Sequence, residues 1–365
     1  MTGAKWRRTL LILVMGTLVT ALAVLGEANP QRSSLFAQPA AEPPKPSSIV
    51  VNSSGGIVNR ILRQVFLSVF EQRHGIKVID TSPTDFAKLQ AMVRSGNVEW
   101  NITEISGIDG FRALRLGLLE PIDFKIVDVS DFPKAVVNDY LLPVSFFSTI
   151  MAYRTDAFPA GRRPQSWADF WDVKKFPGPR ALQNTPVDNL EFALLADGVP
   201  LERLYPLDVT RAFRKLDQIK RHITVWWTTG AQSPQLLVDR EVVLATAWNA
   251  RIMDIMRKGA PVRMEWNQGL LKIAYMAIPR GARDAHWNQR MLAIFADAEL
   301  QGKWTNIIPY PGPNLKAMAY VDPAIRPFLP TYEENLKKQV VQKDAWWEEN
   351  MARLQERWNR WMLIR

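Results

Sequence analysis

The 365-residue sequence contains no cysteine, and this absence removes several kinds of chemistry. Disulfides, thiolate metal sites, a cysteine nucleophile and a lipid-modified N-terminal cysteine are all excluded. Histidine is scarce as well: His74, His222 and His286 stand far apart, in settings typical of helix ends and loops. We expect each of them to be a solvated surface residue, so the sequence predicts no metal site.

The sequence also lacks the motifs of common catalytic and nucleotide-binding sites. It has no G-x-S-x-G nucleophile elbow, no H-E-x-x-H zinc helix and no phosphate-binding loop ending in Gly-Lys-Ser/Thr. The net charge is +10, but no block of basic residues is interleaved with aromatic residues in the way typical of nucleic-acid binding. We therefore expect no catalytic residues, no cofactor and no nucleic-acid partner. An enzyme whose acidic residues converge in space is the main alternative class.

A long uncharged run does occur near the N-terminus, at residues 10–25, after Lys5, Arg7 and Arg8. A basic start followed by an apolar run is typical of a secretory signal. The run is slightly shorter than the roughly 20 residues of a membrane-spanning helix. We predict that residues 1–37 are a signal peptide and that the protein is periplasmic, with an uncleaved N-terminal anchor as the alternative. The Pro-rich residues 38–47 are predicted to be an extended linker.

The first folded part has the pattern of a strand, a helix and a second strand, at residues 49–51, 58–71 and 76–79. The turn at residues 52–56 (NSSGG) leaves backbone N–H groups at a helix N-terminus, where an anion or a carbonyl group can bind. The elements expected next are a helix at 84–94 capped by Thr84, a strand at 100–105 with Ser106 at its tip, a helix at 109–116 and a long apolar segment at 140–153.

The second part of the chain carries further helical and strand patterns. Ser166 and Asp169 have the spacing of a capping box. Helices are expected at 188–195, 208–220 and 234–239, the last capped by Ser233, and a strand is expected at 224–227. The tail at 332–363 is predicted to be helical, with Trp347, Met351, Leu354, Trp358 and Trp361 on one face. We expect this face to pack on the protein's own core; a partner helix or a membrane surface is the alternative.

Residues 239–281 contain the most informative pattern. A short apolar strand at 242–247 ends at Trp248 and Asn249, a helix follows at 250–258, and a second strand runs from 270 to 278. Two strands with polar or aromatic ends, joined by one helix, are typical of half of a ligand cleft in an open α/β sheet.

With these pieces in place, the chain resembles the periplasmic solute-binding proteins of ABC importers, and in particular the spermidine/putrescine-binding group. The resemblance runs from about residue 49 to the C-terminus. The stretches that carry it are residues 52–56 (NSSGG), 70–78 (FEQRHGIKV), 117–123 (GLLEPID), 166–171 (SWADFW), 247–249 (AWN), 277–279 (AIP) and 310–314 (YPGPN).

The resemblance implies an α/β fold of the two-lobed periplasmic-binding-protein type (type II), in which each lobe is a mixed sheet flanked by helices and the ligand cleft lies between the lobes. Lobe 1 would be residues 48–147 and 276–321, and lobe 2 would be residues 148–275. Residues 322–365 would form C-terminal helices that pack on the lobes. A monomer of this kind would capture a small-molecule solute by hinge closure and deliver it to an ABC permease in the inner membrane, with its ATPase.

The sequence departs from that group at the positions that bind amines. An aromatic and acidic pair after the first strand is missing, since residues 53–56 are Ser-Ser-Gly-Gly, and an acidic position in the third strand is Asn101. An acidic pair is replaced by Asn184 and Thr185, and the last strand carries Lys272 and Ala274. Because an ammonium ion needs carboxylates and aromatic faces, these losses favour a neutral or anionic solute.

Four alternatives stay open: a polyamine ligand, an exported binding or interaction protein without a transport role, a hydrolase, and a ferric-iron binder, for which the tyrosines are too isolated. The predicted ligand-binding residues are Ser53, Ser54, Gly55, Gly56, Ser106, Phe146, Phe147, Asn184, Asp188, Trp227, Thr228, Thr229, Trp248, Asn249, Arg251 and Lys272.

Overall fold

The computed structural model describes residues 42–159 and 161–364. The predicted signal peptide and the first residues of the linker therefore lie outside the described part of the chain. Everything reported below belongs to one compact unit, Pro44–Arg365. Within the described residues, no helix is both long enough and apolar enough to span a membrane.

The strands of this unit join into one mixed sheet with the order β2-β1-β3-β9-β5-β8-β6-β7, and the short strands β4 and β10 pair with β9. Its strands are β1 (Ser48–Asn52), β2 (Lys77–Thr81), β3 (Ile102–Ser106), β4 (Leu119–Glu120), β5 (Leu142–Arg154), β6 (Arg180–Gln183), β7 (Ile223–Trp227), β8 (Leu244–Trp248), β9 (Val262–Pro279) and β10 (Val340–Val341). The mixed α/β class predicted from the sequence is confirmed.

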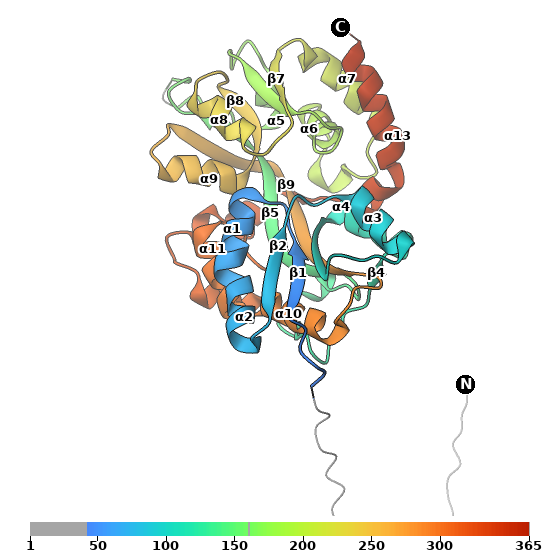
Figure 1. Ribbon diagram of the computed structural model, residues 1–365. Coiled ribbons are helices and arrows are strands. Elements are labelled where there is room, and N and C mark those ends of the chain that lie inside the picture. The colour runs from blue at the N-terminus through green and yellow to red at the C-terminus, as the bar shows by residue number, and fades with distance from the viewer. Residues whose placement is uncertain (1–41, 160, 365) are drawn as a thin grey trace, which may run out of the picture. The chain divides into compact units, whose positions relative to one another are not determined.

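Two lobes share this sheet, each with its own hydrophobic core (Figure 1). The first lobe contains α1 (Gly56–Leu62), α2 (Ser68–His74), α3 (Phe86–Ser95), α4 (Gly107–Arg115), α10 (Ala285–Ala296) and α11 (Ala298–Ile307). The second lobe contains α5 (Trp167–Trp171), α6 (Asn189–Ala196), α7 (Val209–Lys220), α8 (Gln232–Val238) and α9 (Asn249–Arg257). A π-helical stretch, Arg63–Leu67, joins α1 to α2, and Gly75 ends α2 in the left-handed conformation (φ 67).

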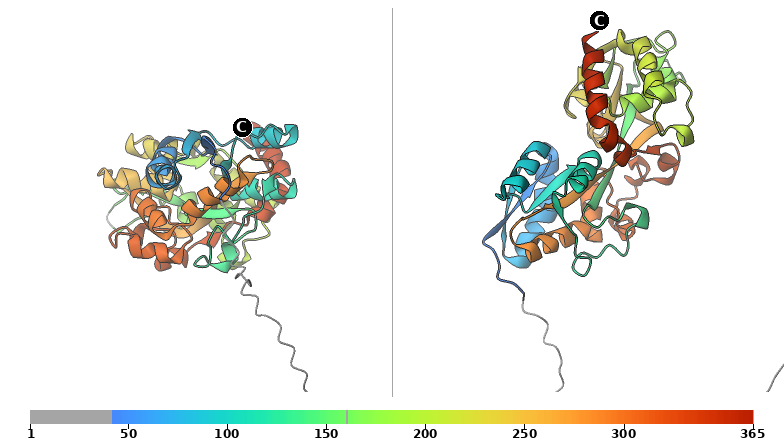
Figure 2. Two further views of the ribbon diagram at one scale, coloured as in Figure 1. Left: turned by 60° about the horizontal axis from the view of Figure 1, so that its bottom comes forward. Right: turned by 90° about the vertical axis from the view of Figure 1, so that its right-hand side faces the viewer.

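Strands β5 and β9 connect the two lobes (Figures 1 and 2). They run antiparallel to each other, with pairs from Leu142 opposite Met276 to Arg154 opposite Val262. The boundaries predicted at residues 147/148 and 275/276 fall inside these two strands, so each strand belongs to both lobes. The strand expected at 270–278 is only the second half of β9, because the more polar residues 262–269 concealed its first half.

The C-terminal tail differs from the continuous helix predicted for it. A short helix, α12 (Glu333–Leu336), is followed by β10, which pairs in parallel with β9, and only then by α13 (Asp344–Leu363). The β-branched pair Val340 and Val341 favours an extended chain there. The apolar face of α13 is buried in the core of the second lobe through Trp347, Leu354, Trp358 and Trp361, which confirms the predicted docking.

Two of the three predicted helix caps also need correction. Asp85, not Thr84, caps α3, because its carboxylate accepts a hydrogen bond from the Lys88 backbone N–H at 3.0 Å. Ser233 lies inside α8 rather than before it, and its hydroxyl donates to the carbonyl of Thr246 on β8. The third cap is confirmed: the Ser166 hydroxyl accepts a hydrogen bond from the Asp169 N–H at 3.3 Å.

A buried carboxylate holds α13 against α6. Glu191 is fully buried, and its Oε1 accepts hydrogen bonds of 2.6 Å from the Tyr205 hydroxyl and from the Trp347 indole N–H. Its Oε2 has no partner within the described chain. Burial, assisted by the nearby Asp188 charge, raises the pKa of Glu191 from 4.5 to about 7. The folded protein therefore favours the protonated form of this group.

This shift predicts a pH-dependent stability. Because the pKa of Glu191 is raised on folding, its contribution is fully present below 4.5 and is lost as the pH rises through about 7. Chemical denaturation between about pH 5 and about pH 8 should show the free energy of unfolding falling by on the order of 3 kcal/mol more in the wild type than in Glu191→Gln. Replacement of the exposed Glu333 by Gln is the matched control. A wild-type profile parallel to that of Glu191→Gln would contradict the assignment.

Candidate functional site

The turn between β1 and α1 forms the first side of the candidate site. Ser53 is buried, and its hydroxyl accepts a hydrogen bond from a side-chain amide of α1. Gly55 and Gly56 both have positive φ (81 and 64), which explains two successive glycines at this turn. Ser54 directs its backbone N–H at a carboxylate oxygen of Glu104, 2.7 Å away. One N–H of the predicted anion-binding turn is thus already used by an acidic side chain.

Glu104 was not predicted as a site residue. It lies on β3 opposite Met276 of β9, is partly buried, and has a pKa raised by burial against the opposing effect of the Ser54 hydrogen bond. Together with Ser106 and Asp109 it lines a hollow of about 90 Å³. Ser106 caps α4 through the Asp109 backbone N–H. The sequence feature that could have identified Glu104 is that it is the single charged residue of an otherwise uncharged strand.

The start of α9 forms the second part of the candidate site. Asn249, its first residue, is fully buried: its Oδ1 accepts from the Ser148 N–H at 2.9 Å, and its Nδ2 donates to the carbonyl of Pro309 at 3.0 Å. Asn249 therefore ties α9 to β5 and to the chain after α11. Both ends of its amide are occupied, so its role here is to hold its two neighbours, Trp248 and Arg251, in place.

Two buried hydrogen-bond donors next to Asn249 have no partner. They are the indole Nε1 of Trp248 and the guanidinium Nε of Arg251, and neither meets an acceptor among the described residues. Trp248 is the last residue of β8 and Arg251 lies in the first turn of α9, so the two donors flank the buried Asn249 along the chain. The Trp248 ring packs on Gly230 so closely that a Cβ there would lie 2.2 Å from it. This close packing against Gly230 holds the indole ring in place.

Three aromatic rings pack together beside the start of α9. Phe147 on β5 lies with its ring centroid 6.3 Å from that of Trp248 and 5.7 Å from that of Tyr310. Burial raises the pKa of Tyr310, the positive charge of Arg251 lowers it, and the negative charge of Glu104 raises it. The Tyr310 hydroxyl thus lies within the electrostatic reach of one cation and one anion.

A close ion pair occupies the next position along the crossing strands. Lys272 is the cross-strand neighbour of Phe147, and its Nζ lies 2.5 Å from Oδ2 of Asp188 and 5.8 Å from the centroid of the Phe147 ring. The same carboxylate accepts from the Thr149 hydroxyl at 2.7 Å and from the Gln342 amide at 3.2 Å. Lys272 therefore does not supply the free positive charge that was inferred for it from the sequence.

Other predicted residues adjoin this group or lie further away, with their polar groups used in the fold or exposed. The Trp227 ring packs against that of Trp248, with centroids 6.0 Å apart. Trp227 is fully buried and donates its indole N–H to the Thr246 hydroxyl. The amide oxygen of Asn184 accepts from the indole of Trp358 on α13. Phe146 is buried and bonded through its backbone N–H to the carbonyl of Pro311. Thr228 and Thr229 are exposed at the end of β7, beside Gly230.

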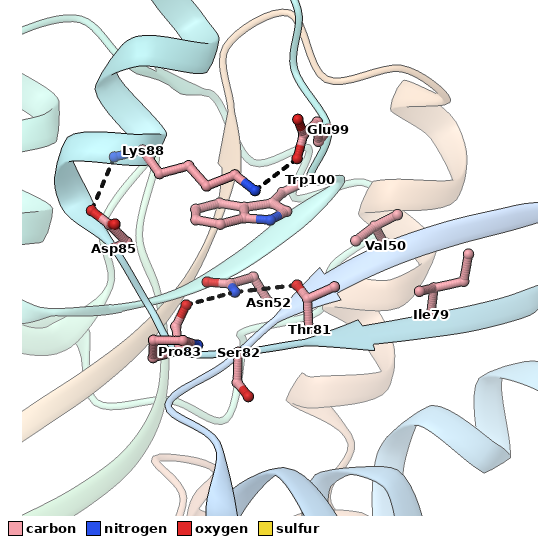
Figure 3. A pocket seen from close by; sticks show the side chains of 10 residues that line it. All are labelled: Val50, Asn52, Ile79, Thr81, Ser82, Pro83, Asp85, Lys88, Glu99 and Trp100. Atoms are coloured by element: carbon pink, nitrogen blue, oxygen red, sulfur yellow. Dashed lines mark hydrogen bonds and ion pairs between the residues drawn. The ribbon is translucent and has the colours of Figure 1, made fainter.

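A larger hollow of about 390 Å³ lies at the outer edge of the first lobe, beside β1 and β2 (Figure 3). Several of its polar groups are already paired: the Asn52 amide donates to Thr81 and to the Pro83 carbonyl, and Lys88 pairs with Glu99 at 2.8 Å. This hollow therefore offers a ligand fewer unpartnered buried donors than the group around Trp248 and Arg251. No cluster of acidic and histidine side chains suited to a metal ion occurs in the described part of the chain.

Comparison with known proteins agrees with this architecture. A family model described as "Bacterial extracellular solute-binding protein" matches residues 67–328. The gamma-aminobutyric acid-binding protein of Pseudomonas aeruginosa is 33% identical over 339 residues, covering 90% of this chain and 96% of that protein.

Two solved structures superpose closely on the chain. One is an ABC transporter substrate-binding protein from Bradyrhizobium japonicum USDA 110, 37% identical, with a TM-score of 0.83 over 87% of this chain and 100% of that one. The other, the Atu4243–GABA receptor, is 32% identical, with a TM-score of 0.82 over 87% of this chain and 98% of that one. The resemblance predicted from the sequence is confirmed. The chain belongs to the bacterial extracellular solute-binding proteins and is a solute-binding component of an ABC transporter.

Proposed function

We propose that the solute is a small amino acid with its carboxylate and its ammonium group at opposite ends, of the gamma-aminobutyric acid (GABA) type. The observation that carries this proposal is the pair of buried, unpartnered donors on Trp248 and Arg251, together with the negative charge of Glu104, which like that of Arg251 acts on Tyr310. The names of the relatives from Pseudomonas aeruginosa and of the Atu4243 receptor support the same ligand class.

The carboxylate end of such a solute fits the start of α9. A buried donor without a partner costs about 1–3 kcal/mol, so two adjacent ones favour a ligand that brings acceptors. Arg251 supplies a positive charge and directional N–H groups for a carboxylate. The helix N-terminus adds backbone N–H groups and the positive end of its dipole. Such a zwitterion has no net charge and agrees with the neutral or anionic solute expected from the sequence, with Arg251 in place of Lys272 as the cationic partner.

The ammonium end fits Glu104 and the aromatic rings. A partly buried carboxylate whose pKa is raised by burial gains from a neighbouring cation, which lowers that pKa again. Phe147 and Tyr310 present ring faces suited to cation–π contact. A diamine would place a second ammonium beside Arg251 and leave the unpartnered donors unsatisfied. A polyamine therefore fits this site less well than an amino acid.

The transport role implies further features that we also propose. The protein is exported to the periplasm, acts there as a monomer and delivers its solute to an inner-membrane permease with its ATPase. The lobes close on the solute by a hinge motion at β5 and β9, the two strands shared by both lobes.

Arg251→Met should weaken GABA binding by at least about tenfold, because a charge-assisted hydrogen bond is worth about 1.5–3 kcal/mol. Isothermal titration calorimetry with GABA and with butyrate measures the effect. Both ligands carry the carboxylate, so both should lose affinity. The matched control is Arg257→Met, at the exposed end of the same helix. Unchanged affinity for both ligands in a folded Arg251→Met protein would contradict the assignment.

Glu104→Gln should separate the two ligands. GABA carries an ammonium and butyrate does not, so only GABA should lose affinity, again by about tenfold or more. Because the pKa of Glu104 is raised by burial, wild-type GABA affinity should also fall on acidification before the solute carboxylate is protonated. The Gln variant should lack that early fall. An equal loss for both ligands would assign Glu104 a structural role instead.

A further inference from the structure

We propose that Lys272 is a specificity-determining residue that excludes solutes with two ammonium groups, because its own ammonium already occupies a cation site. The inference rests on the proposed function, since it concerns the same group of side chains. It goes further by assigning the residue that separates amino acids from diamines.

The surroundings of Lys272 Nζ are those of a bound amine. The nitrogen lies 2.5 Å from an Asp188 carboxylate oxygen and 5.8 Å from the centroid of the Phe147 ring. A carboxylate on one side and an aromatic face on the other are the partners that an ammonium ligand requires. The Lys272 side chain is 12% exposed and that of Asp188 is 2% exposed. The tethered ammonium thus pairs with a buried acid and lies near the Phe147 ring of the candidate site.

Asp188 is held rigidly enough to serve as such a receptor. Its other hydrogen bonds come from two neutral donors, the Thr149 hydroxyl on β5 and the Gln342 amide before α13. It takes a positive φ of 71 just before α6. Without Lys272, these bonds would still hold the carboxylate in place, but its charge would be unbalanced.

A second carboxylate lies close to the same lysine. Asp344, the first residue of α13, packs against α4, where a Cβ on Gly107 would lie 2.0 Å from its Oδ2. Burial raises the pKa of Asp344 to about 7, while the Lys272 charge lowers it and the Asp188 charge raises it. The Lys272 ammonium is in contact with Asp188, and its charge also acts on Asp344. Removing it would leave an acidic, aromatic-lined space next to Phe147.

A purely structural ion pair is the competing explanation, and the two make different predictions. A structural pair predicts that loss of Lys272 lowers stability and changes no selectivity. A tethered ammonium that fills a cation site predicts that the variant gains a new ligand, because a free diamine can replace the missing charge.

The test is Lys272→Gln, which removes the charge but keeps a hydrogen-bond donor toward Asp188. Calorimetry with putrescine should show at least about tenfold tighter binding than in the wild type, while GABA binding changes by less than that. The gain should grow as the pH rises above about 7, because loss of the Lys272 charge, which lowers the pKa of Asp344, moves the ionisation of Asp344 to higher pH. The exposed, ion-paired Lys303 provides the matched control, Lys303→Gln, which should leave both affinities unchanged.

The double variant Lys272→Gln, Asp188→Asn tests whether a putrescine gain comes from the negative charge of Asp188 or only from a change in side-chain volume. It keeps a neutral pair of similar volume, so it should fold and should lack the putrescine gain. If Lys272→Gln does not fold, the apolar Lys272→Met is measured in its place, with its thermal midpoint recorded with and without putrescine. Absence of any putrescine gain or midpoint rise in a folded variant would overturn the proposal, as would an equal gain in the double variant.

GABA binding by the wild-type protein distinguishes failure of the proposed function from failure of the role proposed for Lys272. If the wild-type protein binds neither GABA nor a similar amino acid but Lys272→Gln still gains putrescine, the proposed function fails and the role of Lys272 stands. If the wild type binds GABA and the variant gains nothing, the role of Lys272 fails alone.

Discussion

The antiparallel pairing of β5 with β9 is the constraint on which the rest of the structure depends. Both strands pass through both lobes, and two register irregularities, near Ser145 and near Met151, interrupt their otherwise continuous pairing. This register places Phe147 opposite Lys272. Asn249 braces β5 on one side, through bonds to Ser148 and Pro309. Any movement of the lobes must therefore turn about strands whose side chains also form the site.

Most of the fold could be predicted from local patterns because the responsible forces act over a few residues. The opening strand, helix and strand, the end of β8 at Trp248 and the apolar face of α13 all follow from periodicity and turn chemistry. The exceptions are elements that depend on distant partners. The pair Val340–Val341 is a strand only because β9 lies beside it, and the polar first half of β9 is a strand only because β5 pairs with it.

The candidate site could be predicted only in part, because residue types were visible and their pairing was not. Trp248, Arg251 and Phe147 were identified from strand ends and neighbouring positions. Lys272, in contrast, was interpreted as a free charge, since its partner Asp188 lies 84 residues away in the chain. Glu104 was overlooked because nothing local shows that the N–H of Ser54 will meet it across the fold. Pairing at such separations is set by the sheet order.

Two pairs of oppositely charged side chains in this region differ in whether the charges are in contact, and this difference bears on function. Lys272 and Asp188 are in direct contact and satisfy each other. Arg251 on α9 and Glu104 on β3 belong to different lobes and both act on the pKa of Tyr310, and the guanidinium Nε has no partner among the described residues. Partly buried charges held apart in this way cost stability that direct contact would recover. A protein tolerates such a cost where a ligand offsets it, and the proposed zwitterionic solute would bring an opposite charge to each of the two groups.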